Sequence, residues 1–456
     1  MAESSSLIQP RTVTGDGDGI VSHAGLVWLA DVADWTGLTA GLSVAMGRVA
    51  HRRHDPGRTL AQMVLSLADG GTCVSDLAQL RDQPSLFGPV ASHPTTWRTF
   101  DQIGPAELRG LTAATTDARE IAWASGAGPS GELTIVDIDA THVNTRAVKQ
   151  DGAPTYKRLF GHYPLLAMEP DTGEVLAAMM RPGNAGSGTA TDHVNLLAAA
   201  IAALPMPWRG GHDQGDNAAI VTKPVLIRTD SAGATHWLAE ECVERNLLFS
   251  FGYPIGGPVR DAVMCVDDDR WLPARNRRKA RDGAWVVELT DYVNLAAWPK
   301  GTRLICRRER PHPGAQLSLF DTVEGFRHQC FITNQTDSDI VELELRHRQR
   351  GRSETIIRDT KACGLANLPF DDIVNNTVWM HLATIANNLL VWAKRLTLTG
   401  KLRTATPKTI RHRLLHVAAR ISPRRLKLDR NWPWTTTILD AIDRLNIRFR
   451  PHTVTS

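Results

Sequence analysis

The stretch ELTIVDIDAT, residues 132–141, decides the fold class of this chain. Its apolar residues are β-branched and alternate with other side chains, which is typical of a β-strand, and Asp137 and Asp139 lie near its end. Upstream, from Leu26 to about Phe100, the apolar residues follow helical spacing instead. We therefore predict an α-helical N-terminal region that is followed at Glu132 by the first strand of a sheet.

Strand and helix signals alternate downstream of this stretch. Residues 156–184 predict two strands joined by the turn signal Glu-Pro-Asp-Thr-Gly, and residues 191–204 predict an apolar helix. Residues 224–246 then predict a strand, a tight turn that contains Asp230, and another helix. This order indicates an α/β fold, a mixed sheet with helices packed on it.

Length and composition are those of a folded globular protein of roughly two to four domains. The chain has 456 residues, of which 42% are hydrophobic and 22% are charged. Its six cysteines form no C-x-x-C pair, which argues against a zinc ribbon and a secreted disulfide framework. The N-terminus lacks a signal-peptide pattern and no apolar run is long enough for a membrane span, so we expect a cytoplasmic protein.

The charge is unevenly distributed. Residues 391–456 hold 15 Lys and Arg against three Asp, a local net charge of +12, whereas the rest of the chain carries −8. A basic tail favours a phosphate-backbone partner, because each cation that meets a phosphate releases a condensed counterion. A solvated helical face explains the composition alone equally well.

Three carboxylates come from elements that are far apart in the sequence. Asp139 closes the first strand, Asp230 closes a later strand, and Glu354 lies in a helix. Such oxygen ligands suit Mg²⁺, and two ions would activate an attacking oxygen and stabilise a leaving one at a phosphate. Asp137 lies on the same strand face as Asp139 and is an alternative first ligand. Taken singly, each acid is more often a turn or cap residue.

The segment RHRQRGRSETIIRDTKACG, residues 346–364, places one carboxylate among cations. At about 100° per residue, five residues fall within one narrow stripe of a helix. They are His347, Arg350, Glu354, Arg358 and Lys361. This stripe fits a metal ligand with phosphate-binding neighbours, and a salt-bridged surface face is the alternative.

The spacing within this stripe resembles the Y-x2-R-x3-E-x6-K signature of bacterial cut-and-paste insertion-sequence transposases, with His347 in place of the tyrosine. Further segments resemble the insertion-sequence 1380 family of DDE transposases, from about Glu132 to Leu396 and more weakly through the termini. These segments are VDIDAT, YKRLFGHYPLLA, RPGN, TDSAG, RLICRRERPHPGAQLSLF and FITN.

The resemblance implies an RNase H-like catalytic domain that a β-strand insertion interrupts between the second Asp and the Glu. Here 124 residues separate Asp230 from Glu354, which leaves room for such an insertion. By position, the resemblance makes Asp139, Asp230 and Glu354 the catalytic, metal-binding triad. Arg350 and Lys361 would hold phosphates of the transposon end.

Two further groups of residues follow from the resemblance. Arg358 and His347 join the expected phosphate-binding residues, and His347 replaces a phenol by an imidazole whose charge varies near neutral pH. In related transposases an aromatic side chain from the insertion stacks on a flipped base. Trp298 is our preferred candidate over Trp271 and Trp285, and a buried core position is the alternative for each of them.

The sequence thus predicts a DNA transposase that binds terminal inverted repeats as a homodimer, cleaves DNA and joins a 3′-OH to target DNA. Two Mg²⁺ ions, with Mn²⁺ as a substitute, would assist the chemistry, and the protein would be nucleoid-associated in a bacterial cytoplasm. The alternatives are an RNase H-type nuclease without strand transfer and an inactive DNA-binding relative that acts as a regulator.

The chain is predicted to have five segments. They are a flexible leader, residues 1–24; a helical N-terminal DNA-binding region, 25–128; the catalytic domain, 129–253 with 341–398; the β-strand insertion, 254–340; and a basic helical C-terminal region, 399–456.

Overall fold

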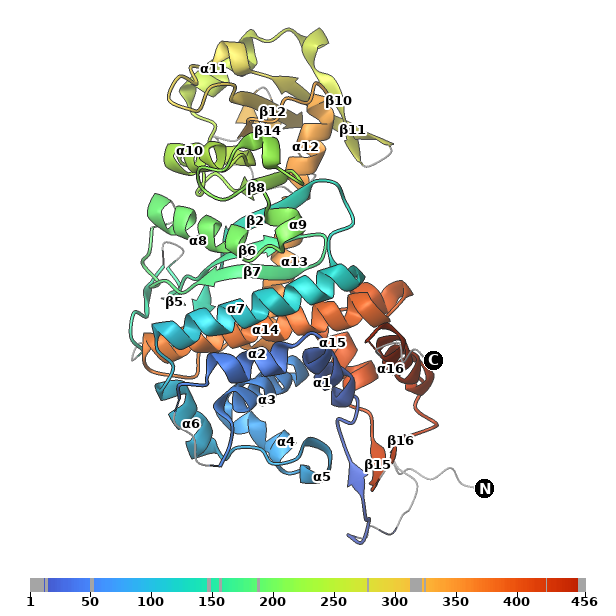
Figure 1. Cartoon of the computed structure of the whole chain (residues 1–456). Helices are drawn as coiled ribbons and strands as arrows, with labels where there is room; N and C mark the ends of the chain where they lie inside the picture. The colour runs from blue at the N-terminus through green and yellow to red at the C-terminus, as the bar shows by residue number, and fades with distance from the viewer. Residues whose placement is uncertain are drawn as a thin grey trace, which may run out of the picture.

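A computed structural model shows one large mixed sheet, with helices from both ends of the chain stacked below it (Figure 1). The structure describes residues 12, 15–49, 53–145, 149–155, 158–186, 189–276, 279–311, 322, 323, 325–423 and 425–449. The remaining residues include parts of the predicted leader and basic tail and of two segments that carry the family resemblance, 156–157 and 312–320. Among the described helices, none has both the length and the apolar character that a membrane crossing requires.

The sheet is built around β2, which is the predicted strand at residues 132–141. Its strand order is β10-β11-β12-β14-β9-β8-β2-β6-β7, with β13 paired to β14. β2 runs antiparallel to β6 and parallel to β8, and β8 runs parallel to β9. The strands of this half are β2 (Thr134–Ala140), β6 (Leu165–Glu169), β7 (Glu174–Met179), β8 (Val225–Thr229) and β9 (Leu248–Tyr253). The prediction of a mixed α/β sheet is confirmed.

The strands of the predicted insertion continue this same sheet. β14 pairs with β9 in antiparallel register, so that Phe331 lies opposite Gly252. The inserted strands are β10 (Leu272–Asn276), β11 (Lys279–Glu288), β12 (Arg303–Glu309), β13 (Thr322–Val323) and β14 (Phe326–Thr333). A separate small sheet holds β3 (Val143–Asn144), β5 (Phe160–His162) and β4 (Ala153–Pro154). The limits of the insertion, residues 254–340, stay a prediction.

Two long helices cover the β7 edge of the sheet, α7 (Pro105–Ala122) and α14 (Ile373–Thr397) (Figure 1). Asn388 of α14 exchanges two hydrogen bonds of 2.8 Å with the backbone of Val175 in β7. Arg119 of α7 is buried and pairs with Glu174 at 2.9 Å. These polar side chains satisfy the backbone and charge of an edge strand that is buried in the molecule.

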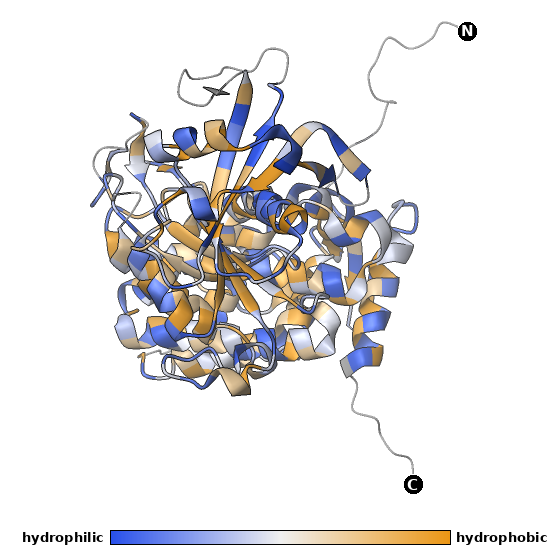
Figure 2. Cartoon of the chain, turned by 90° about the horizontal axis from the view of Figure 1, so that it is seen from above, coloured by the Kyte–Doolittle hydropathy of each residue, from blue (hydrophilic) through white to orange (hydrophobic). Residues whose placement is uncertain are grey.

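The N-terminal helices form a layer beneath α14. α3 lies within the stretch from Leu26 to about Phe100 for which helical spacing was predicted: Asp55 caps its start, and Gly70, at φ +111°, ends it. The helices of this layer are α1 (Leu26–Trp35), α2 (Leu38–Ala45), α3 (Pro56–Asp69), α4 (Ala78–Arg81), α5 (Pro84–Phe87) and α6 (His93–Asp101). Seen from above, apolar residues gather on the central strands and on inner helix faces (Figure 2).

The remaining helices lie along the sheet or close the chain. They are α8 (Ala190–Ala202), α9 (Met206–Arg209), α10 (His236–Glu244), α11 (Gly257–Cys265), α12 (Ile340–Arg348), α13 (Arg352–Thr360), α15 (Pro407–Ile410) and α16 (Thr435–Phe449).

The two ends of the chain meet in a second three-stranded sheet. β1 (Ile20–Val21) pairs with β15 (Ala419–Ser422), which pairs with β16 (Arg425–Leu428). The end of the leader predicted as flexible is therefore ordered, and the basic C-terminal region contains strands as well as helices. The sequence did not predict this second sheet, because β15 pairs with a strand at the opposite end of the chain.

Candidate active site

Two of the predicted acids meet at the carboxyl ends of β2 and β8, two neighbouring parallel strands of the central sheet. The parallel register pairs Asp137 of β2 with Arg228 of β8, so Asp139 and Asp230 lie two residues further along neighbouring strands. Burial raises the pKa of the Asp139 carboxyl, Arg350 opposes this shift, and the charge of Asp230 raises that pKa further. The two carboxylates thus repel each other, as groups that share a cation site do.

A tight turn fixes Asp230. Its Oδ1 accepts hydrogen bonds of 3.1 Å from the backbone N–H groups of Ala232 and Gly233. A Cβ at Gly252, on the neighbouring β9, would lie 2.7 Å from the backbone N of Ser231. The turn therefore packs directly on the backbone of β9 and holds one oxygen of Asp230, while its Oδ2 accepts no such bond from the turn.

Asp137 lies inside the sheet, and its two oxygens are already bound. Arg228 donates to both of them, at 2.6 and 2.8 Å, and both side chains are buried. Arg228 also donates to the carbonyl of Arg346 at the end of α12. Asp139 sits two residues further on with its side chain about 20% exposed. The geometry favours Asp139 over Asp137 as a ligand.

Arg350, which lies between α12 and α13, is the cation beside these acids. Its Nη1 lies 3.3 Å from Oδ2 of Asp139 and is buried. Within the described part of the chain this atom makes an ion pair but no hydrogen bond. The guanidinium thus keeps a donor for an anion that enters beside Asp139.

The predicted cationic stripe is not carried by one regular helix. α12 ends at Arg348, a 3-10 turn spans Gln349–Gly351, α13 follows, and a π-helical turn begins at Lys361. The assumption of a constant 100° per residue is therefore wrong, because a 3-10 turn winds more tightly than an α-helix. The five residues of the stripe therefore do not share one helix face.

His347 lies on the cavity side of the helix. Its Nδ1 is 2.9 Å from Oγ of Ser250, and its ring stacks on Phe331 with the ring centres 4.4 Å apart. Burial and then the nearby arginines lower the pKa of His347 to about 3. The expectation that its charge varies near neutral pH is wrong: the imidazole is neutral there.

Lys361, Arg358 and Glu354 lie beyond the 3-10 turn. Lys361 donates a 2.7 Å hydrogen bond to the carbonyl of His142, just after β2, and burial lowers its pKa. Arg358 is exposed and pairs with Asp359 at 3.0 Å. Glu354 is exposed and forms no ion pair with the described residues. Glu354 lies between Arg350, which contacts Asp139, and Lys361, which binds the carbonyl of His142.

A cavity of about 430 Å³ opens beside Asp230. Asp230, Tyr253, Arg307, His328, Phe331 and Arg350 are among its lining residues. It lies between the end of β8 and the inserted strand β14, so the insertion supplies part of its wall.

Trp298, the preferred stacking residue, does not line this cavity. It is half-buried and its ring centre lies 6.1 Å from that of Tyr253, which does line the cavity. Trp271 is buried, and Trp285 is half-buried against Phe326. A role in stacking stays a prediction for all three.

The donor set at the strand ends suits a hard divalent cation. Asp139 and Asp230 offer carboxylate oxygens, and one oxygen of Asp230 is held by backbone N–H groups and so cannot rotate away. Arg350 is the cation that partly offsets their charge. The residues present therefore fit Mg²⁺ or Mn²⁺.

Sequence reasoning missed Arg228, Ser250 and Phe331. Arg228 had a signal: it is a charged residue within an apolar strand and precedes Asp230 by two positions, as Asp137 precedes Asp139. Ser250 and Phe331 had none, because only the pairing of β9 with β14 brings them to His347.

A family model described as transposase DDE domain group 1 matches residues 8–448. The chain belongs to this transposase family. Among solved structures, this DDE transposase is similar to the piggyBac transposase in its synaptic complex with hairpin DNA, determined by cryo-EM. The identity is 10% and the TM-score 0.40, over 95% of this chain and 82% of that one. No curated protein matches the sequence.

Proposed function

We propose that this DDE transposase is a cut-and-paste enzyme of the insertion-sequence 1380 type, which cleaves DNA at terminal inverted repeats and joins the 3′-OH ends to target DNA. The observation that carries the proposal is the meeting of Asp139 and Asp230 at the ends of parallel strands, with Arg350 beside them. The strands β7-β6-β2-β8-β9 would form the RNase H-like core of residues 129–253 and 341–398.

Asp139, Asp230 and Glu354 would hold the divalent cations. Two bound Mg²⁺ ions would lower the charge of the scissile phosphate and favour formation of the attacking oxygen nucleophile. Glu354 suits this role because it is exposed on α13, whose flanking residues Arg350 and Lys361 contact the end of β2. It would complete the site when DNA fills the space in front of Asp139.

The phosphate-binding roles differ among the four basic residues. Arg350 would donate to a phosphate oxygen through Nη1, which pairs with Asp139 but makes no hydrogen bond, and His347 would donate as a neutral imidazole. Lys361 is already bound to the carbonyl of His142, so its first role is to hold the helix against β2. Arg358 is exposed and would contact the DNA backbone further out, and Trp298 would stack near the cavity wall.

DNA would extend from this site over the flanking regions. The basic region 399–456 and the helical region 25–128 would bind the terminal repeats, and the insertion 254–340 would line the cleavage site. A homodimer would hold the two ends together, in the nucleoid of a bacterial cytoplasm. The local charge of +12 near the C-terminus supports this arrangement, because it favours a phosphate backbone.

Cleavage of linear DNA that carries the element's own ends tests the proposal. We expect Mg²⁺-dependent cleavage that EDTA abolishes and that is lost in Asp139→Asn, Asp230→Asn and Glu354→Gln with end binding retained. Asp213→Asn is the matched control, because Asp213 is an acid paired with Arg209 outside the site. Cleavage that persists in all three acid variants would refute the assignment.

Pre-cut ends separate the alternatives. A transposase joins their 3′-OH groups to target DNA, whereas an RNase H-type nuclease does not. An inactive regulator would bind the ends without cutting them in the wild type.

A further inference from the structure

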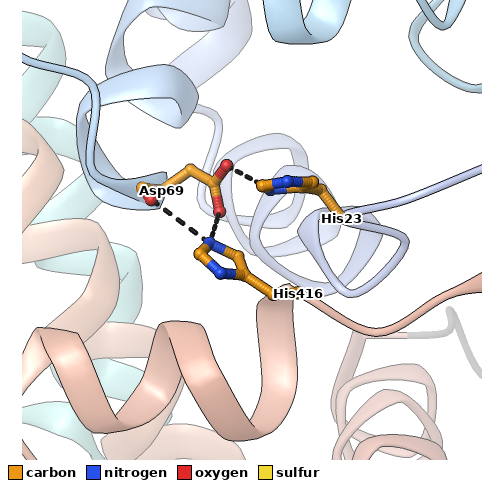
Figure 3. A group of neighbouring side chains, drawn as sticks. All are labelled: His23, Asp69 and His416. Carbon is orange, nitrogen blue, oxygen red and sulfur yellow. Dashed lines mark hydrogen bonds and ion pairs between the residues drawn. The ribbon is translucent and has the colours of Figure 1, made fainter. Parts of the chain in front are cut away.

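A second cluster of ligand-type side chains lies far from the acids, where the ends of the chain meet. His23, Asp69 and His416 place one ligand atom each within 4.8 Å of one another (Figure 3). His23 precedes α1, Asp69 is the last residue of α3, and His416 precedes β15. Three segments that are remote in sequence thus converge on one carboxylate.

The carboxylate of Asp69 is fully buried, and each of its oxygens faces one imidazole. Oδ2 lies 2.6 Å from Nδ1 of His23, and Oδ1 lies 3.0 Å from Nε2 of His416. The two rings are themselves only 4.3 Å apart between centres. A buried carboxylate with two converging imidazoles is a common ligand set for Zn²⁺ and related ions.

The backbone conformation of His23 and the contacts of Arg411 favour a metal site at Asp69. His23 adopts φ +55°, a conformation that costs energy in a non-glycine residue and turns the imidazole toward Asp69. Arg411 lies beside this region, but it donates to the carbonyls of Leu67 and Ala68 and not to the carboxylate. The charge of Asp69 is therefore left to the two histidines.

The present separations are close to those of a metal site. Ligand atoms about 2.0–2.1 Å from a tetrahedral Zn²⁺ are separated by about 3.3 Å. The N–O distance of 3.0 Å at His416 needs to open by about 0.3 Å, and the distance of 2.6 Å at His23 by about 0.7 Å. His416 is 40% exposed, so a water molecule can reach a fourth position.

We infer that His23, Asp69 and His416 form a binding site for one transition-metal ion, with Zn²⁺ as the best match, which ties the N-terminal and C-terminal segments to the end of α3. The site is structural: His23 lies two residues after β1 and His416 three residues before β15, so the ion fixes the two strands that pair with each other. It is independent of the acids at the central sheet.

Metal titration of the full chain, stripped of metal beforehand, tests this site. We expect this cluster to bind one equivalent of Zn²⁺ that raises the melting temperature, and Co²⁺ in its place to give the visible absorption of a tetrahedral complex. His416→Gln and Asp69→Asn should each lose that equivalent and the absorption. His412→Gln is the matched control, because His412 is an exposed histidine of the same segment that contacts Trp432 instead.

Two results would overturn the inference. One is the absence of a stoichiometric Zn²⁺ equivalent in the wild type, and the other is an equivalent that survives in His416→Gln. His23→Asn provides a further variant. Asparagine tolerates the positive φ at this position, so this change removes the imidazole without disturbing the backbone. Metal bound at Asp139 and Asp230 would persist in all of these variants and is thereby distinguished.

Discussion

Replacing Arg228 by methionine should destabilise the protein strongly, although Arg228 is not placed to contact DNA. The change leaves Asp137 fully buried with neither oxygen bound by its former partner, which donates at 2.6 and 2.8 Å. Breaking a buried pair in this way lowers the free energy of unfolding by about 3–5 kcal/mol. With an unfolding entropy of about 2.1 cal/mol/K per residue, the melting temperature of a chain this long should fall by about 3–5 °C.

Thermal unfolding followed by circular dichroism measures this effect, and two further variants calibrate it. Arg209→Met removes the half-buried i,i+4 partner of Asp213 and should change the free energy of unfolding by about 0–1 kcal/mol. Arg228→Met combined with Asp137→Leu removes both charges and should recover more than half of the loss. The reasoning fails if Arg228→Met costs no more than Arg209→Met.

Three further predictions concern the helix beside the acids. Arg350→Ala should slow cleavage by about ten- to hundredfold in an end-cleavage assay, because a charge-assisted contact worth about 1.5–3 kcal/mol is lost. Lys361→Met should lower the free energy of unfolding by about 1–3 kcal/mol in urea titrations, because the carbonyl of His142 loses its donor. His347 has a pKa of about 3 in the folded protein against 6.5 in the unfolded chain. The unfolded chain therefore binds the proton first, and stability should fall as pH decreases from 6.5 toward 3, less steeply in His347→Gln.

Each of these has a contrary outcome. Cleavage at the wild-type rate in Arg350→Ala would exclude a phosphate contact, and an unchanged urea midpoint in Lys361→Met would mean that the bond to His142 carries no stability. Equal acid sensitivity of wild type and His347→Gln would place the responsible titration elsewhere.

The sequence predicted what local patterns encode. The alternation of residues 132–141 and the turn around Asp230 gave two strands, and parallel pairing then brought Asp139 and Asp230 to one edge. Long-range pairing was not predictable: the contact of β1 with β15 and the attachment of β14 to β9 depend on partners that no local window contains.

The helix beside the acids shows the same limit at short range. A uniform helix would place Glu354 and its basic neighbours on one stripe. Instead, Arg350, which reaches Asp139, lies within the 3-10 turn Gln349–Gly351, whereas the exposed Glu354 lies in α13 after that turn. Spacing alone does not show where a helix tightens. The buried ion pair of Asp137 with Arg228 was equally unpredictable, because it depends on the register between β2 and β8.

The continuous sheet has a mechanical consequence. Because β9 is hydrogen-bonded to β8 on one side and to β14 on the other, the inserted strands cannot swing on a hinge relative to Asp139 and Asp230. Under the proposed function, any adjustment of shape between a duplex and both of these parts would fall to the DNA, and bending it by 40–90° costs about 1–6 kcal/mol. Ends with flexible pyrimidine–purine steps near the cut would then be favoured without any contact to their bases.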